Sequence, residues 1–351
     1  MKCGGPRMTA RPFVPPLSVA PMVDRTHRHF RAFFRRLTRR TLLYTEMLTT
    51  GAILRGDRAR VLGFSPWEDP VALQVGGDDP EALARCAELA QELGYAEVNL
   101  NVGCPSPRVQ KGRFGAMLMA EPEVVADAVV AMRRATDLPV TVKHRIGIDG
   151  LERYEDMLNF VDCVAQAGSQ RFTVHARIAR LNGLSPKANR EVPPLRYEDV
   201  YRLKRERPEL VVELNGGIKT LEQAQAHRDV VDAVMIGRAA TDDPWIFARA
   251  DSVFYGEVDP VATRQQAVYD HLDYLRTWQQ RGVKLALLVA PMINLFAGER
   301  NARRWRRALS EDVRQPGATP DVLCAALDEL FDQPKSGILE PFDVTETGER
   351  P

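Results

Sequence analysis

Residues 71–102, VALQVGGDDPEALARCAELAQELGYAEVNLNV, contain the pattern that decides the fold. An apolar run over Val71–Val75 is followed by a helical pattern over Pro80–Leu93 and a second apolar run over Glu97–Val102. Short apolar strands that alternate with helices are typical of a parallel sheet with both faces covered. This stretch therefore predicts one strand–helix–strand unit of an α/β protein.

The same alternation extends in both directions, from about residue 17 to residue 240. Eight short apolar runs are recognisable there: Leu17–Met22, Leu42–Leu48, Val71–Val75, Glu97–Val102, Val140–Arg145, Arg171–His175, Leu210–Leu214 and Ala233–Ile236. Amphipathic stretches lie between them, as in Pro122–Ala135, Leu151–Ala167 and Leu221–His227. Eight such units predict a closed (β/α)8 TIM barrel. A doubly wound open sheet is the alternative, but it needs fewer strands and a glycine-rich turn after the first strand, where this chain has Ala20–Asp24.

The pattern changes after Pro244, where we expect helices only, including Thr263–Gln280 and Pro320–Phe331. The predicted organisation is a flexible leader over 1–12, a catalytic barrel over 13–250, a small all-α helical domain over 251–332 and a flexible tail over 333–351.

Composition excludes several classes of protein. The chain is 44% hydrophobic and 27% charged, as is usual for a soluble globular protein. No apolar run approaches the roughly 18 residues of a membrane span, and the N-terminus lacks the apolar core of a secretory signal. Five scattered cysteines form no CxxC pair and show no metal-ligand spacing with histidines. We therefore expect a cytoplasmic protein without disulfides, without a metal and without an obligate protein partner.

Arginines gather in two stretches, residues 25–40 and 300–307, although the formal net charge is only +1. Helical spacing would place several members of each set on a common face. Such local patches suit contacts with nucleic-acid phosphates. The alternative is a solvated helix face whose arginines pair with acidic residues.

Polar groups follow six of the apolar runs, where a TIM barrel carries its active site. They are Gln74, Asn101 with Cys104, Lys143–Arg145, His175 with Arg177, Asn215–Gly217, and Gly237–Arg238. The last two groups follow strands seven and eight, whose loops commonly bind phosphate, and they supply glycines and a cation. A mononucleotide such as FMN is the natural cofactor. Lys143 and Gln74 would then face the flavin ring, where a lysine stabilises the anionic reduced form. A salt-bridged structural lysine is the alternative for Lys143.

Cys104 differs from the other cysteines because it follows a strand end, between Gly103 and Pro105, which fix the backbone. A free thiol is largely protonated at neutral pH and can donate a proton. Cys86 and Cys163 lie inside helical patterns, where we expect inert buried side chains.

Several motifs resemble those of the tRNA-dihydrouridine synthases. They are Asn99–Gly112 (NLNVGCPSPRVQKG), Ala20–Asp24 (APMVD) and Val174–Arg177 (VHAR). Gly183–Leu195 (GLSPKANREVPPL) is similar to the A-type subfamily, which acts on D-loop uridines 20 and 20a. The resemblance covers about residues 15 to 310.

This resemblance implies that NADPH reduces FMN, that the reduced flavin gives a hydride to C6 of a flipped uracil in tRNA, and that Cys104 protonates C5. The implied FMN contacts are Pro21, Met22, Val23, Gln74, Lys143, His175, Asn215, Gly216, Gly217, Gly237 and Arg238. The implied tRNA contacts are Asn101, Arg177, Lys187, Arg190, Arg303 and Arg306.

The chain departs from the family pattern in four places: Arg25–His27 replaces Trp-Thr-Asp, Met117 and His144 replace frequent cysteines, and Ala290–Met292 replaces Arg-His-Met. Two other functions are considered. An FMN oxidoreductase acting on a free pyrimidine or small enone would share the barrel but would not need the helical domain or the arginines at 300–307. A catalytically silent tRNA-binding protein would not need Cys104, Lys143 and His175.

Overall fold

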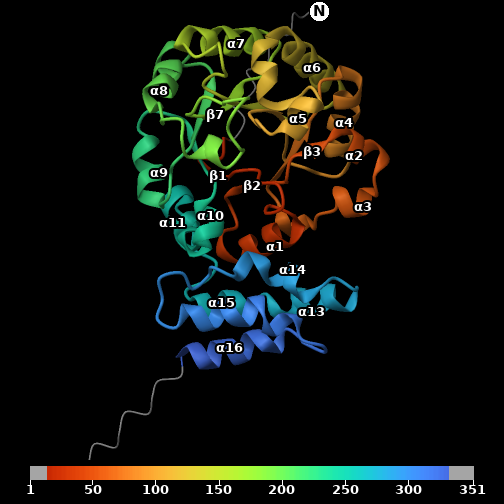
Figure 1. Ribbon diagram of the computed structural model, residues 1–351, viewed down its shortest axis with the longest axis vertical. Coiled ribbons are helices and arrows are strands. Elements are labelled where there is room, and N and C mark those ends of the chain that lie inside the picture. Colours follow the sequence, from red (N-terminus) through yellow and green to blue (C-terminus); the bar gives the residue numbers. More distant parts are fainter. Residues whose placement is uncertain (1–13, 332–351) are drawn as a thin grey trace, which may run out of the picture.

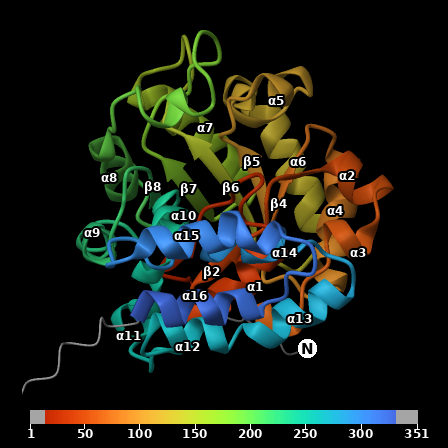
Figure 2. The ribbon, with the colours of Figure 1, turned by 60° about the horizontal axis from the view of Figure 1, so that its bottom comes forward.

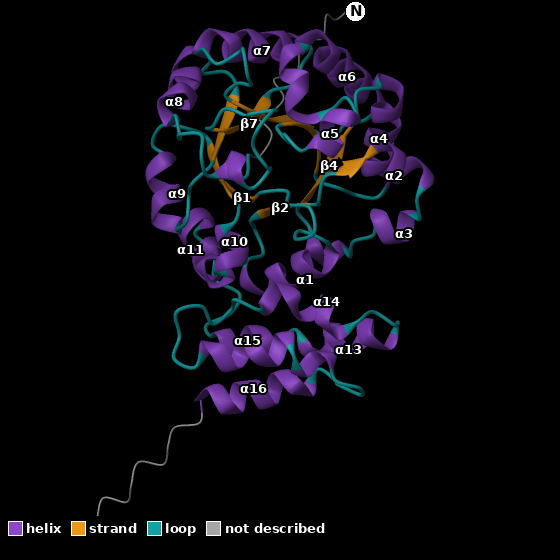
Figure 3. Ribbon diagram, viewed as in Figure 1, coloured by secondary structure: helices purple, strands orange, loops and turns teal. Residues whose placement is uncertain are grey.

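In the computed structural model, which describes residues 14–331, eight strands close into a parallel barrel (Figures 1 and 3). They are β1 (Leu17–Val19), β2 (Leu42–Tyr44), β4 (Val71–Gly76), β5 (Glu97–Val102), β6 (Val140–Arg145), β7 (Arg171–His175), β8 (Val211–Asn215) and β9 (Ala233–Ile236). The ring closes because β1 pairs with both β9 and β2, while β2 pairs with β4. The predicted (β/α)8 barrel is confirmed. The predicted leader and tail, and Cys3, lie outside the described residues.

The expected run Leu42–Leu48 is not one strand but two, β2 and the short β3 (Leu48–Thr49), which pairs with β4. The split occurs at Thr45, whose hydroxyl oxygen accepts the Gln74 N–H at 3.0 Å. The Thr45 hydroxyl thus replaces the backbone carbonyl that would accept this N–H in a regular strand, and the pairing of β2 with β4 ends there. Four other runs, starting at Glu97, Val140, Arg171 and Ala233, match their strands residue for residue.

Helices surround the ring of strands (Figure 3). They are α1 (Arg28–Leu37), α2 (Thr50–Arg55), α3 (Arg58–Val61), α4 (Pro80–Glu92), α5 (Pro107–Lys111), α6 (Pro122–Ala135), α7 (Tyr154–Gln166), α8 (Tyr197–Glu206), α9 (Leu221–His227), α10 (Ala239–Asp242) and α11 (Ala250–Tyr255). The first of the predicted helices shows why the sequence forms them. Asp79 caps α4 by accepting the Glu81 N–H at 3.0 Å, and Pro80 suits the first helical position. Its apolar face, including Leu83 and Ala87, is buried.

The C-terminal helices form a separate layer beside the barrel (Figures 1 and 2). They are α12 (Arg264–Tyr269), α13 (Leu272–Gln280), α14 (Leu285–Val289), α15 (Ala302–Ser310) and α16 (Asp321–Phe331). Helix α14 packs against α1, so α1 connects the barrel to this layer. The single helix expected over Thr263–Gln280 is wrong. The chain breaks between α12 and α13, where His271 turns into the core beside Phe33 and Tyr274.

The centre of the barrel is ionic, which the sequence analysis did not predict. The buried Arg171 guanidinium contacts carboxylate oxygens of Glu97 and Glu213, each at 3.0 Å. Tyr44 donates to Glu97 at 2.7 Å and Ser18 donates to Glu213 at 2.6 Å. A buried charge is tolerated only when it is paired and hydrogen-bonded, and these contacts supply both conditions. None of the helices within residues 14–331 is long and apolar enough to cross a membrane.

Candidate active site

The predicted strand-end residues lie on one rim of the barrel. The parallel ladder sets Asn101 beside Lys143, Arg145 beside His175, and His175 beside Asn215. At the closing strand, the Ala20 N–H donates to the Ile236 carbonyl at 2.8 Å. This bond brings the segment that starts at Pro21 next to Gly237. The convergence expected from the sequence is therefore present.

A chain of hydrogen bonds connects the ionic centre to this rim. Thr141 donates to Glu97 at 2.6 Å, and the Asn99 amide donates to Thr141 at 2.7 Å. Gln74 donates to Asn99 and accepts from the Asn101 amide, both at 2.8 Å. All five side chains are buried. The amide planes of Gln74 and Asn101 are thus fixed by the barrel itself.

Asn101 in turn fixes the loop that carries Cys104. Its side-chain oxygen accepts the N–H groups of Gly103 at 3.2 Å and Cys104 at 3.0 Å. The Cys104 carbonyl accepts the Ala116 N–H at 2.9 Å. Gly115 has φ 78°, and a Cβ there would lie 2.5 Å from that carbonyl. The backbone of Cys104 is thus held on both sides, while the residue is partly exposed. Its predicted proton-donor role remains a prediction.

Lys143 lacks an acidic partner. Its Nζ lies 3.1 Å from the Asn215 side-chain oxygen, and no ion pair involves it within residues 14–331. Burial, reinforced by Arg145 and opposed by Glu213, lowers the pKa of Lys143 to about 7. The structure does not support the alternative of a salt-bridged lysine. A partly buried amine without a counter-charge among the described residues is suited to an anionic ligand.

The glycines after β8 and the glycine after β9 differ in whether the protein's own backbone and packing require glycine at that position. Gly216 has φ 119°, and a Cβ there would lie 2.7 Å from His175 Cδ2. Gly217 has φ 75°, and its Cβ would lie 2.5 Å from Leu195. Gly237 has no positive φ, and a Cβ there would meet only Ala20 Cβ at 3.8 Å. The chain therefore does not itself need glycine at 237, and the open space beside this backbone fits the close approach of a phosphate.

Cations surround the rim. Arg238 pairs with Glu191 at 2.6 Å and donates to the Arg190 carbonyl at 3.2 Å. Arg177 donates to the carbonyls of Glu191 and Pro193. Both arginines therefore hold the segment between β7 and α8, on which Lys187 and Arg190 are exposed. Both side chains have hydrogen bonds within the protein, and the ligand contacts predicted for Arg177 and Arg238 remain predictions.

His175 is neutral in this setting. Burial, with the added repulsion of Arg145 and Lys143, holds its pKa well below the usual range. Of the remaining predicted cofactor residues, Met22 packs against the core, and its N–H donates to the Thr26 hydroxyl at 3.0 Å. Pro21 is half-buried beside it, whereas Val23 is 55% exposed.

Arg303 and Arg306 lie on the exposed face of α15, among the C-terminal helices. The opposite face of this helix is anchored by the buried Trp305, which donates to the Met292 carbonyl at 2.8 Å. Within the part of the chain that the structure describes, neither arginine forms an ion pair. Both are therefore available to an anionic partner.

The first arginine stretch is only partly a surface patch. Arg35 is buried and donates to the carbonyls of Glu68, Thr41 and Pro70, each at 2.8 Å. Arg31 is also buried and lies 3.3 Å from a Glu68 carboxylate oxygen. The expectation of a common arginine face is wrong for these two side chains, because they fasten α1 to the segment before β4.

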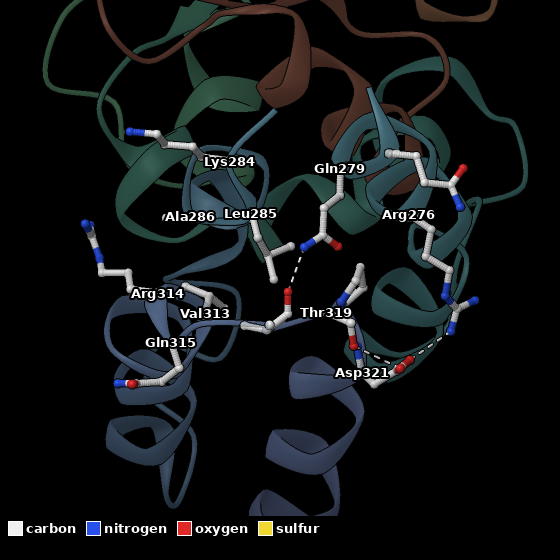
Figure 4. A pocket seen from close by; sticks show the side chains of 14 residues that line it. Arg276, Gln279, Lys284, Leu285, Ala286, Val313, Arg314, Gln315, Thr319 and Asp321 are labelled. Carbon is white, nitrogen blue, oxygen red and sulfur yellow. Dashed lines mark hydrogen bonds and ion pairs between the residues drawn. The ribbon is translucent and has the colours of Figure 1, made fainter. Parts of the chain in front are cut away.

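A groove of about 820 Å³ lies within the C-terminal helices, between the α13–α14 turn and the segment before α16 (Figure 4). Arg276 and Asp321 pair at 3.1 Å on one side of it, and Gln279 donates to the Ala318 carbonyl at 2.7 Å. None of the strand-end residues lines this groove, so it is not the candidate active site. Among residues 14–331, no group of three or more His, Cys, Asp or Glu could hold a metal ion.

Sequence reasoning missed two residues that shape the site. Asn189, buried inside the motif Gly183–Leu195, donates to the carbonyls of Arg180, Leu184 and Ser185 at 2.8, 3.3 and 3.4 Å. Gln110 donates to the carbonyls of Pro105 and Leu181 at 3.0 and 2.9 Å. For Asn189 the available signal was an amide inside a loop motif, since buried amides commonly satisfy loop carbonyls. Gln110 lies in α5 and carried no comparable signal.

Comparison with known proteins gives a family match, two similar relatives and one solved structure of similar fold. The family model described as dihydrouridine synthase (Dus) matches residues 18–331. The tRNA-dihydrouridine(20/20a) synthase of Synechocystis sp. is 56% identical over 312 residues, which are 89% of this chain and 93% of that protein. The protein of the same name from Vibrio cholerae is 50% identical over 315 residues, covering 90% of this chain and 96% of the relative. A solved 2-naphthoyl-CoA reductase complex shares the fold with a TM-score of 0.53 at 10% identity, over 67% of this chain and 49% of that one.

Proposed function

The chain belongs to the dihydrouridine synthase family, and from this premise we propose that it reduces a uridine of the tRNA D-loop, at position 20 or 20a. The cofactor is FMN, which supplies the hydride for C6 of the uracil when it is bound, and NADPH is the reductant. The catalytic unit corresponds to residues 13–250 and the RNA-binding unit to residues 251–332. The site of action is the cytoplasm.

One observation supports this function most directly: Cys104 stands on a rigid loop at the same rim as the unpaired Lys143 and the open Gly237. The three features suit three parts of one reaction. Gly237, with Gly216 and Gly217, would receive the phosphate, and Lys143 would face the flavin ring. Cys104 is then the acid for the carbon next to the one that receives the hydride.

In this reaction the proton of Cys104 moves from Sγ to C5 of the uracil. The S–H bond breaks and the C5–H bond forms, while the hydride forms the C6–H bond and the C5=C6 double bond is lost. A positioned general acid typically contributes a factor of about 10²–10⁴ to the rate. The side-chain oxygen of Asn101 accepts the N–H groups of Gly103 and Cys104 and so fixes the backbone from which the thiol projects during this transfer.

The RNA contacts come from two elements. Lys187 and Arg190, on the segment between β7 and α8, lie beside the mouth of the barrel, and Arg303 and Arg306 lie on α15. Extraction of a stacked uracil costs a few kcal/mol, and phosphate contacts by such arginines offset this cost without reading sequence. Asn101 and Arg177, which the sequence resemblance assigns to tRNA, have hydrogen bonds within the protein, and a role at the uracil remains a proposal.

The test is a single-turnover experiment with chemically reduced enzyme under exclusion of oxygen. Unmodified tRNA should reoxidise the flavin, seen as the return of its visible absorbance, and the RNA should gain dihydrouridine. Reoxidation by free uridine or a small enone, with no response to tRNA, would instead favour the small-molecule oxidoreductase. A flavin that neither substrate reoxidises would favour the silent tRNA-binding protein.

A further inference from the structure

Arg145, at the end of β6, is a buried cation held by two loops. It is 3% exposed, and its Nε donates to the Gly103 carbonyl at 3.1 Å. One terminal nitrogen donates to the Asn189 carbonyl, also at 3.1 Å. Within the described part of the chain, no carboxylate pairs with it. A buried guanidinium that contacts only carbonyl oxygens is costly, so its retention calls for a reason beyond packing.

The two loops that Arg145 joins carry different parts of the proposed site. Gly103 precedes Cys104, and its N–H is already fixed by Asn101. Asn189 lies between Lys187 and Arg190 and closes its own loop through its side-chain amide. Each loop is thus stiff by itself, and Arg145 determines how one stands relative to the other.

Arg145 and Cys104 also influence each other electrostatically. Burial lowers the pKa of Arg145 to about 10, and Cys104 opposes that shift while Arg190 and Arg177 add to it. When Cys104 gives its proton to C5 it becomes an anion. A cation fixed next to the loop stabilises that anion. The rigid, planar guanidinium also holds two carbonyls of different loops in a fixed geometry, which the flexible side chain of a lysine does not impose.

We propose that Arg145 is a positioning residue, which sets the Cys104 loop against the RNA-contact loop so that a docked uracil meets the thiol. This inference rests on the proposed function. It predicts that Arg145 affects the chemical step through Cys104 more than it affects the binding of RNA. It also predicts that a lysine in place of Arg145 restores the positive charge but does not hold the two loops in the same relative position.

The experiment compares Arg145→Lys and Arg145→Gln with a matched control, Arg180→Lys, in flavin-loaded protein. Arg180 pins the same RNA-contact loop through Asp149 at 2.9 Å and through Glu152, and it has no contact with the Cys104 loop. Anaerobic reoxidation of the reduced flavin is followed over a range of tRNA concentrations. Both Arg145 variants should lose at least tenfold in maximal rate, whereas the Arg180 variant should change the half-saturating tRNA concentration and keep the rate.

Combination with Cys104→Ala separates positioning from a structural role. If Arg145 acts through Cys104, Arg145→Lys should cost nothing further in the Cys104→Ala background. Equal fractional losses in both backgrounds, or an Arg145→Lys rate like that of the parent, would overturn the proposal. Where Arg145→Gln fails to fold, the Lys variant alone decides the outcome. A parent protein that tRNA does not reoxidise would refute the proposed function instead, and would be recognised before any variant is compared.

Discussion

The side-chain oxygen of Asn215 lies 3.1 Å from Nζ of Lys143, so that the ends of β6 and β8 are linked across β7. The same asparagine donates to the Met235 carbonyl on β9 at 2.8 Å. One amide therefore joins the lysine expected at the flavin ring to the strand ends expected at the phosphate. The position of the lysine depends on this amide, because no acidic side chain holds it within the described residues.

Lys143→Met should make the flavin harder to reduce. A hydrogen bond to a charged group is worth about 1.5–3 kcal/mol, and 30 mV corresponds to about 1.4 kcal/mol for a two-electron couple. The midpoint potential should therefore fall by roughly 30–60 mV. In Lys143→Arg the charge is retained, so the midpoint potential should fall less than in Lys143→Met. An unchanged potential in the Met variant would place this lysine away from the flavin.

Cys104→Ala should retain flavin and tRNA affinity but lose about 10²–10⁴-fold in turnover, because only the general acid is removed. Flavin absorbance and tRNA binding are measured on the same preparation as turnover. The fold should tolerate the change, since the loop is fixed through backbone groups of Gly103 and Cys104. Loss of flavin in this variant would show that Cys104 is structural.

The barrel could be predicted from sequence because its signal is local. Runs such as Glu97–Val102 are strongly patterned, here with an apolar residue at every second position, and the observed strand has the predicted bounds. The break at His271 could not be predicted, because it depends on Phe33, a residue far away in sequence. The short strand β3 could not be predicted for the same reason, because it is defined by its pairing with β4 and not by its own sequence pattern.

The candidate site divides in a similar way. Glycines and a cysteine at strand ends carry their own signal, so Cys104 and Gly237 could be singled out from sequence. Glu213 and Arg171 could not, because a charged residue in a strand is interpreted as exposed unless its partner is known. Arg35 shows the opposite error, since helical spacing suggests a surface arginine where the structure has a buried one.

Gly237→Ala should weaken FMN binding without weakening the fold. The added methyl meets only Ala20 Cβ at 3.8 Å, and the backbone needs no positive φ. Removal of backbone freedom from the unfolded chain can even stabilise by about 0.4–1 kcal/mol. Gly216→Ala is the contrasting variant, because its φ of 119° and a 2.7 Å approach to His175 strain the fold itself. Thermal unfolding without flavin and flavin titration distinguish the two effects. Flavin affinity equal to that of the parent in Gly237→Ala would move the phosphate elsewhere.

Arg303→Ala combined with Arg306→Ala should weaken tRNA binding and reduce its salt dependence. Each lost phosphate contact lowers the slope of log affinity against log salt by about 1, so the pair should lower it by about 2. Arg304→Ala with Arg307→Ala is the matched control on α15, because Arg307 already pairs with Glu311 at 3.0 Å. Binding is measured at several salt concentrations. An unchanged slope in the first pair would remove those arginines from the RNA interface.

Acid should loosen the contact between the barrel and the C-terminal helices. His27, His29 and His271 lie at this contact, and burial is the main cause that lowers their pKa values to about 4, 3 and 3 from 6.5. Nearby arginines add to each shift, namely Arg28, Arg31 and Arg36. The unfolded chain therefore takes up protons first as the pH falls below 6.5, and stability is lost between that pH and about 3. Above 6.5 this contribution to stability is complete.

His271→Phe tests this most directly, because His271 is fully buried, stacks on Tyr274 and has no hydrogen-bond partner for either ring nitrogen among the described residues. One pKa unit corresponds to about 1.4 kcal/mol, so at pH 5 the wild-type protein should lose roughly 2 kcal/mol more than this variant, relative to pH 7.5. Denaturant unfolding at the two pH values measures the difference. His227→Gln, on α9 outside this contact, is the comparison variant: burial also lowers the pKa of His227, so this variant should lose the hydrogen bond with Tyr201 at both pH values and remove only its own share of the acid response. A His271→Phe protein that loses as much stability as the wild type on acidification would show that His271 does not titrate in this window, and would leave the acid response to the carboxylates.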